Sequence, residues 1–167
     1  LGIPVLGLCY GAQLMAFTLG GKVATAPVSE YGRTEVTILK KTGLLADVAD
    51  ETVTWMSHTD YIEKMPDGFE ATACTPVCPV AAMENEERKL YGLQFHPEVT
   101  HSEEGMKMLS AFVYRSCGCS GDWRMNSFVE ETISAVRSKV GSGKVLCALS
   151  GGVDSSVAAV LMSKAVG

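Results

Sequence analysis

The chain has 167 residues, of which 47% are hydrophobic, and its 14 basic and 19 acidic residues give a formal net charge of -5. This length and apolar content suffice for a packed core, so we expect a globular, soluble protein. No block of basic residues would follow a phosphate backbone and no apolar run approaches the roughly 20 residues of a membrane span, so we expect a cytoplasmic protein without nucleic-acid or membrane partners.

The first part of the chain predicts a strand, a turn and a helix. The apolar run Ile3–Leu6 leads into the sequence GLCYG, residues 7–11, and helical spacing then continues over 12–19 before two glycines. The middle of the chain is rich in β-branched and aromatic residues, and "ENEERK", 84–89, is a polar hairpin turn. We therefore predict strands at 34–39, 53–56, 69–73, 80–83 and 90–95.

The last third of the chain predicts a domain boundary. Apolar residues recur at helical spacing from Ser102 to about Cys117, and small and polar residues follow. We expect a first domain over 1–118, a linker over 119–124 and the start of a second domain over 125–167. In that second domain we predict a helix at 125–140, a strand at 145–149 and a helix at 157–166. The chain starts without Met inside a predicted strand, so we expect it to be incomplete at both ends.

Cys9 stands between Gly7 and Gly11, where the first predicted strand gives way to the helix. This pattern is typical of a nucleophile elbow, although a glycine-bounded core strand produces it as well. The two glycines are expected to relieve crowding in the turn. The amides at the start of the helix are expected to favour the thiolate over the thiol, so Cys9 is a candidate nucleophile.

A thiolate that transfers acyl groups needs a base and a group that orients the base. His96 directly follows a predicted strand, and Pro97 sets a rigid turn behind it. Glu98 lies two residues beyond His96, so in an extended segment the two side chains project to the same side. His96 is therefore the candidate base and Glu98 its orienter. We expect His58 to be a satisfied loop histidine, and His101 has no comparable setting.

The sequences GLCYGAQLMA, residues 7–16, and GLQFHPEV, residues 92–99, resemble the class I glutamine amidotransferases. The resemblance implies an α/β, flavodoxin-like fold, incomplete here at the N-terminus, and hydrolysis of glutamine through a thioester. It implies that Cys9, His96 and Glu98 are catalytic, that the Tyr10 amide is an oxyanion donor and that Gln13 lies near glutamine. The family's second oxyanion donor comes from an upstream turn. Because one such donor is worth on the order of 100- to 1000-fold, we expect this piece alone to be weakly active or inactive.

The sequence SGGVDSS, residues 150–156, combines glycines and hydroxyl residues where a strand is predicted to become a helix. Backbone amides and the helix dipole then converge on an anion, which favours a phosphate site over a merely capped turn. It is not a Walker A loop, because no lysine follows the glycines. It resembles the pyrophosphate loop of N-type ATP pyrophosphatases, which have an adenine nucleotide alpha hydrolase-like fold. By that resemblance, ATP is bound by Ser150, Gly151, Gly152, Val153, Asp154, Ser155 and Ser156, and Asp154 is a candidate ligand of the Mg²⁺ that accompanies ATP.

The order of the two sites describes an enzyme that activates an oxygen with ATP and displaces it with nitrogen from glutamine. The sequences EYGRTE, WMSHTD and CTPVCPVAAMEN extend a resemblance to glutamine-dependent ligases that convert xanthosine monophosphate to GMP. The resemblance implies glutamine, ATP and xanthosine monophosphate as substrates, AMP and pyrophosphate as products, and a homodimer of the full-length protein. Three alternatives remain: another glutamine-dependent adenylating ligase, a cysteine hydrolase or peptidase, and an inactive amidotransferase fragment.

The six cysteines do not predict a disulfide framework, which is typical of short secreted chains with weak cores. They also lack a second Cys or His pair at the spacing of a zinc site. We therefore expect reduced structural thiols rather than metal ligands at Cys74, Cys78, Cys117 and Cys119.

Overall fold

The computed structural model describes residues 2–122 and 124–167, so Leu1 and Trp123, the latter in the predicted linker 119–124, lie outside the described residues. The chain divides into two compact units, Leu1–Cys119 and Ser120–Gly167. Among the described residues, no helix is both long and apolar enough to cross a membrane.

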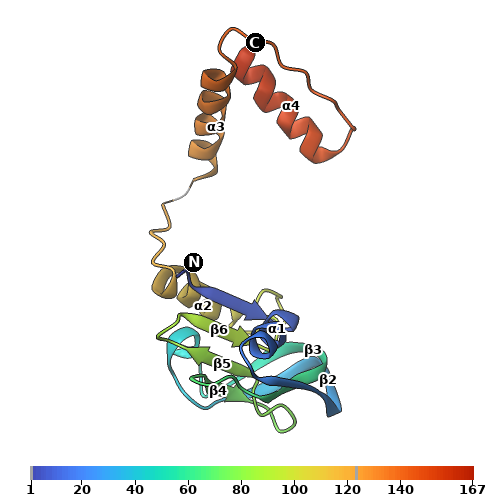
Figure 1. Cartoon of the computed structure of the whole chain (residues 1–167), viewed down its shortest axis with the longest axis vertical. Coiled ribbons are helices and arrows are strands. Elements are labelled where there is room, and N and C mark those ends of the chain that lie inside the picture. The colour runs from blue at the N-terminus through green and yellow to red at the C-terminus, as the bar shows by residue number, and fades with distance from the viewer. Residues whose placement is uncertain (1, 123) are drawn as a thin grey trace. The chain divides into compact units, whose positions relative to one another are not determined.

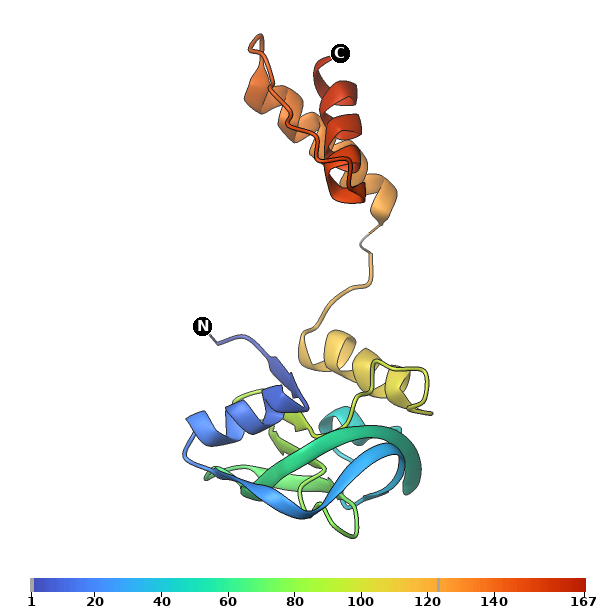
Figure 2. The same cartoon turned by 90° about the vertical axis from the view of Figure 1, so that its right-hand side faces the viewer.

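A curled six-stranded sheet forms the centre of the first unit (Figures 1 and 2). The spatial order of its strands is β1-β6-β5-β4-β2-β3. Strands β1 and β6 are parallel, and all other neighbours are antiparallel. In chain order the strands are β1 Val5–Leu8, β2 Lys22–Ile38, β3 Glu51–Lys64, β4 Glu70–Cys74, β5 Ala82–Asn85 and β6 Leu90–Leu93.

Each strand predicted in this unit overlaps an observed one, but β2 and β3 are much longer than predicted. They pair as one hairpin that extends from Thr37 opposite Glu51 to Lys22 opposite Lys64. Alternate residues of β3 are buried, as in a strand with one face on a core. Several of these buried residues are polar, Thr52, Thr54 and His58 among them, so the alternation is not visible as a hydrophobic pattern.

Helices cover both faces of the sheet. Helix α1, Tyr10–Thr18, follows β1 directly and buries Ala12 and Ala16 against Ile62 and Met83. The opposite face is covered by the short helix η1, Gly43–Leu45, and by α2, Gly105–Ser110, which continues as a π-helix, η2, over Ala111–Ser116. Neighbouring strand residues such as Ala82 and Met83 point to opposite faces and belong to the two different cores.

The second unit contains the helices α3, Met125–Val140, and α4, Val153–Val166. The Arg137 guanidinium donates hydrogen bonds from α3 to the carbonyls of Lys164 and Ala165, which lie in the last turn of α4. The strand predicted at 145–149 is wrong: this segment has no regular structure, and Leu146 is 98% exposed. A strand needs a hydrogen-bonded neighbour, and the described part of this unit offers none. Helix α4 also begins four residues earlier than predicted.

Candidate functional site

Cys9 lies in the turn between β1 and α1 in a backbone conformation that residues other than glycine rarely adopt. Its φ is 49° and its ψ is -107°. Its amide donates to the Leu93 carbonyl at 2.7 Å, and its carbonyl accepts hydrogen bonds from the amides of Ala12 and Gln13. A residue persists in such a conformation only where its surroundings impose it, and strain of this kind is typical of active sites. The turn therefore has the geometry of a nucleophile elbow.

The two glycines beside Cys9 have different roles. A Cβ added to Gly7 would lie 2.6 Å from the carbonyl carbon and oxygen of Gly11 and 2.8 Å from the Ala12 amide nitrogen. Only a residue without a side chain lets α1 begin so close to β1. A Cβ added to Gly11 would have no described atom within 4 Å. The prediction that both glycines relieve crowding is therefore right for Gly7 and wrong for Gly11.

The sulfur of Cys9 is partly buried between a carbonyl and an amide. It donates to the Ser57 carbonyl at 3.6 Å and accepts a hydrogen bond from Gln94 Nε2 at 3.7 Å. The pKa of Cys9 is raised, mainly because burial disfavours the thiolate and further because the Glu98 carboxylate is near. Hydrogen bonds from the Tyr10 amide and from Gln94 act in the opposite direction. The amide at the start of the helix favours the thiolate, as expected, but burial outweighs it, and the thiol needs a base.

This raised pKa predicts how the thiol reacts at different pH values. We expect the alkylation rate of Cys9 by iodoacetamide, without glutamine, to rise with pH and to reach half its maximum above about 8.5, the ordinary pKa of cysteine. The reason is that burial keeps the sulfur protonated through the neutral range. Mass spectrometry of the peptide that contains Cys9 separates its alkylation from that of the other thiols. A midpoint below that ordinary value would contradict burial as the dominant influence.

The imidazole of His96 is held in one orientation by Glu98. The distance between His96 Nδ1 and Glu98 Oε1 is 2.7 Å, and the two side chains are 26% and 45% exposed. An ionised carboxylate can only accept a hydrogen bond, so Nδ1 donates to it, and in the neutral imidazole Nε2 then keeps its lone pair. This tautomer is the one that a general base requires.

The loop that carries His96 is attached to the free edge of β3. The His96 amide donates to the Trp55 carbonyl at 3.0 Å, while Ser102 Oγ donates to the His96 carbonyl at 2.6 Å and accepts from the Trp55 amide at 3.0 Å. Two residues further along the same strand, the Ser57 carbonyl receives the Cys9 thiol. Strand β3 therefore holds both the sulfur of Cys9 and the backbone of His96.

The sheet topology brings Cys9 and His96 to the same edge. Leu8, the last residue of β1, is paired with Leu93, the last residue of the parallel strand β6. Cys9 and His96 therefore both follow the carboxyl ends of neighbouring strands. Among the described residues, no hydrogen bond joins the Cys9 sulfur directly to the His96 imidazole. Catalytic contacts are often long before the substrate binds, so this arrangement is compatible with proton transfer in the complex.

Two glutamines connect the thiol to the interior. Gln13 Nε2 donates to the Asp60 carbonyl at 2.6 Å and to Gln94 Oε1 at 3.1 Å, and Gln94 in turn donates to the Cys9 sulfur. The amide of Gln13, which we expected near the substrate, is thus occupied by protein partners. Gln94 was not predicted as a site residue. The available signal was an amide side chain at the end of an apolar strand, two residues before His96 and therefore on the same side.

The predicted ATP loop, residues 150–156, lies at the start of α4. Gly151 has a φ of 84°, and the hydroxyls of Ser155 and Ser156 each donate to the Gly152 carbonyl at 2.9 Å. Ser150 Oγ donates to Ser155 Oγ at 3.1 Å. Val153 and Asp154 are both exposed in the first turn of the helix. The amides of this first turn have no helical partners and are available to an anion.

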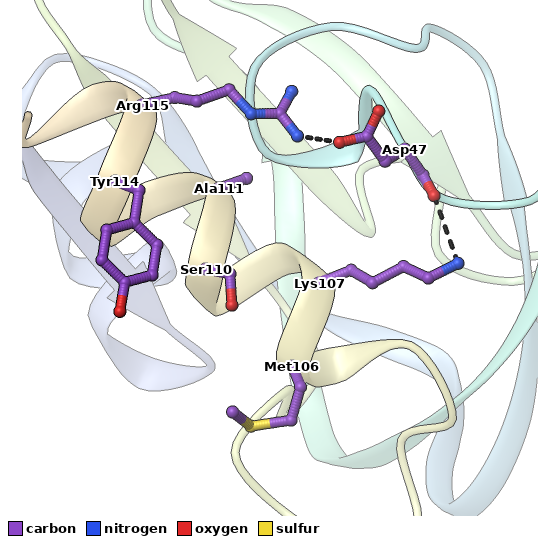
Figure 3. Close-up of a pocket in the computed structure, with 7 residues that line it drawn as sticks. All are labelled: Asp47, Met106, Lys107, Ser110, Ala111, Tyr114 and Arg115. Atoms are coloured by element: carbon purple, nitrogen blue, oxygen red, sulfur yellow. Dashed lines mark hydrogen bonds and ion pairs between the residues drawn. The ribbon is translucent and has the colours of Figure 1, made fainter. Parts of the chain in front are cut away.

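A surface groove lies along α2 and η2, apart from these residues (Figure 3). Its lining includes the exposed side chains of Met106 and Tyr114. Arg115 forms an ion pair with Asp47, and Lys107 Nζ donates to the Asp47 carbonyl at 3.4 Å (Figure 3). None of the predicted site residues lines this groove. The candidate site for catalysis lies instead at the edge of the sheet where β1 and β6 end, beside Cys9 and His96.

Comparisons with known proteins identify the family of the first unit. The family model described as "Glutamine amidotransferase class-I" matches residues 1–116. Over all 167 residues, the chain is 68% identical to a GMP synthase (glutamine-hydrolyzing) of Clostridium botulinum strain Alaska E43 and 61% identical to one of Lachnospira eligens. The chain spans 33% and 32% of the lengths of these two relatives, about a third of each.

Solved structures show the same fold. A putative GMP synthase subunit from Thermoplasma acidophilum is 34% identical, with a TM-score of 0.64 over 66% of this chain and 55% of that one. A glutamine amidotransferase from Thermotoga maritima is 25% identical, with a TM-score of 0.55 over 68% of this chain and 47% of that one. With its α/β fold and curled sheet, the chain belongs to the class-I glutamine amidotransferase family.

Proposed function

We propose that the first unit hydrolyses glutamine to glutamate and ammonia, with Cys9 as the nucleophile, His96 as the base and Glu98 as its orienter. The observation that carries this proposal is the strained Cys9 turn at the same sheet edge as an imidazole whose Nδ1 is 2.7 Å from a carboxylate. The family match over residues 1–116 supports it.

The chemistry begins when His96 Nε2 takes the proton of the Cys9 thiol. The sulfur then attacks the side-chain amide carbon of glutamine, and the Tyr10 amide donates to the oxygen that becomes negative. The carbon–nitrogen bond breaks as the imidazolium returns the proton, and ammonia leaves a thioester on Cys9. Water, deprotonated by His96, attacks the thioester, releases glutamate and restores the thiol. Glu98 stabilises the imidazolium in both halves of the reaction.

We propose further that the full-length protein uses this ammonia to make GMP. In this proposal residues 150–156 bind ATP, xanthosine monophosphate is adenylated, and ammonia displaces AMP after pyrophosphate has left. The 68% identity to a protein named GMP synthase (glutamine-hydrolyzing) supports it. The loop fits Mg²⁺ with ATP, because an exposed carboxylate, Asp154, lies in a helix turn whose amides are free. Bound Mg²⁺ would neutralise the phosphate charge.

Isotope transfer tests the proposal in the full-length protein. With glutamine labelled at its amide nitrogen, ATP, Mg²⁺ and xanthosine monophosphate, we expect labelled GMP together with AMP and pyrophosphate, as detected by mass spectrometry. Labelled ammonia without labelled GMP would indicate a different acceptor and therefore a different glutamine-dependent ligase. Absence of ammonia release from glutamine would contradict the amidotransferase activity itself.

The ATP loop makes a separate prediction. We expect Asp154→Ala to lower GMP synthesis on the order of 100-fold with either glutamine or ammonia as the nitrogen source, because a charge-stabilising group is lost from the phosphate site. The matched control is Glu131→Ala, which removes an exposed carboxylate from α3 of the same unit. Steady-state rates with both nitrogen sources give the answer. Equal rates in the two variants would contradict a role of Asp154 in ATP binding.

A further inference from the structure

Three side chains with metal-binding atoms meet inside the first unit, and none of them is a predicted catalytic group. Glu30 comes from β2, His58 from β3 and Cys78 from the segment between β4 and β5. They are 8%, 4% and 0% exposed, and one ligand atom from each lies within 4.8 Å of the other two. His58 is satisfied by hydrogen bonds, as predicted, but it belongs to a strand and not to a loop.

The hydrogen bonds of His58 locate a proton that a cation would replace. Its Nδ1 lies 3.0 Å from the Asp60 carbonyl, which can only accept, so Nδ1 carries a proton. Its Nε2 lies 3.1 Å from Glu30 Oε2. A nitrogen lone pair and a carboxylate oxygen repel each other at that distance unless a proton lies between them. This pair therefore surrounds one positive charge in the interior.

Cys78 adds a third donor to the same place. Burial, and secondly the charge of Glu30, raise the pKa of its thiol to about 12, so the sulfur is protonated at neutral pH. A divalent cation beside it would reverse this situation, since a coordinating thiol loses its proton. One such ion would replace both the thiol proton and the proton shared by His58 and Glu30.

We propose that Glu30, His58 and Cys78 form a binding site for one Zn²⁺ ion, through Oε2, Nε2 and Sγ respectively. Carboxylate, imidazole and thiolate are the ordinary ligands of zinc. Binding forms three metal–ligand bonds and releases two protons to the solvent. The net charge of the three side chains and the ion together is the same as that of the three side chains before binding, because the two positive charges of Zn²⁺ replace the two released protons. The three protein ligands leave one position of a tetrahedral ion for a fourth ligand, which is water in other zinc sites with three protein ligands.

The surroundings are those of a metal site. Ligating histidines usually donate their second N–H to a carbonyl or carboxylate, as His58 does to Asp60. The ligating carboxylate is supported as well, because Thr75 Oγ1 donates to Glu30 Oε1 at 2.8 Å. Ligand atoms of a tetrahedral zinc ion lie about 3.5 Å apart. The Glu30–His58 pair is already close to this at 3.1 Å, and the Cys78 sulfur lies within 4.8 Å of both of their ligand atoms.

The site adjoins the catalytic groups through one atom. The Asp60 carbonyl accepts hydrogen bonds both from His58 and from Gln13, and Gln13 leads through Gln94 to the Cys9 sulfur. The cation would therefore fix the part of β3 that contacts the thiol. The cysteine spacing predicted no metal site, because the three ligands come from segments far apart in the sequence.

Metal analysis of the full-length protein tests this inference independently of its enzymatic activity. Both the wild-type protein and the Cys78→Ser variant are purified from zinc-supplemented cells by gel filtration, and their zinc is measured by elemental mass spectrometry. We expect the wild-type protein to contain one more zinc ion per chain than the variant. Glu30→Gln should weaken zinc binding about 100-fold or more, since even outer-shell changes cost 10- to 100-fold. Cys74→Ser is the matched control, because it removes a nearby thiol of β4 outside the cluster and should leave the zinc content unchanged.

A second measurement does not depend on the folding of any variant. Wild-type protein, reduced and freed of metal with a chelator, is titrated with Cd²⁺ in a weakly buffered solution. We expect an ultraviolet sulfur-to-metal absorption band that saturates at one ion per chain for this site and two protons released per ion. No tight binding by the wild-type protein, or equal zinc content in Cys78→Ser and Cys74→Ser, would overturn the proposal.

Discussion

Replacing Cys9 with alanine in the full-length protein is expected to abolish GMP synthesis from glutamine while synthesis from added ammonia stays within about twofold of wild type. Removing the nucleophile of a triad lowers the rate by on the order of 10⁶-fold, because the covalent route is lost as a whole. The ammonia-dependent reaction has no thioester step. In the proposed reaction it would use residues 150–156, which lie in the other compact unit, Ser120–Gly167.

The measurement is GMP formation with each nitrogen source at saturating ATP and xanthosine monophosphate. Cys117→Ala serves as the control, because it removes an exposed thiol from the end of the same unit and should behave as wild type. Thermal unfolding of both variants checks that the fold is intact. Loss of both activities in a folded Cys9→Ala protein would contradict the assignment of two separate chemistries, and retained glutamine-dependent synthesis would remove Cys9 from the mechanism.

The fold of the first unit could be predicted where the sequence pattern is local. The elbow and α1 follow from glycine positions and helical spacing within 20 residues. The long hairpin could be predicted only in part, because Thr52, Thr54 and His58 occupy buried positions of β3. Their burial depends on partners in distant segments, such as Glu30 for His58. A period-two pattern that alternates polar with polar residues carries no hydrophobic signal.

In the candidate site, too, the local motifs could be predicted and the distant contacts could not. Cys9, His96 and Glu98 stand in short motifs, and the structure brings the elbow and the oriented imidazole to one edge of the sheet. The supports of these groups are non-local: Ser57 and Trp55 act through backbone carbonyls, which have no sequence signature. The raised pKa of Cys9 was not predictable either. The local turn shows only the helix amides, which lower the pKa, whereas the burial that raises it depends on packing against distant segments.

The elbow itself makes the second large prediction, in which two neighbouring alanine substitutions have opposite effects. We expect Gly7→Ala to destabilise the first unit by about 3 kcal/mol or more, at the upper end of overpacking costs, because its Cβ would lie 2.6 Å from rigid backbone. We expect Gly11→Ala to stabilise it by up to about 1 kcal/mol, because alanine is the better helix former and its Cβ meets no described atom within 4 Å.

Hydrogen exchange of peptides from β1 and α1 in the full-length proteins measures this difference where it arises. Protection should fall in Gly7→Ala and stay level or rise in Gly11→Ala. The glutaminase rate should fall together with protection in Gly7→Ala, because a displaced turn moves the Cys9 sulfur away from the edge of β3 that carries Ser57. Equal protection in the two variants would mean that β1 and α1 can separate without cost. The strained φ of 49° at Cys9 would then not be imposed by the close packing of Gly7.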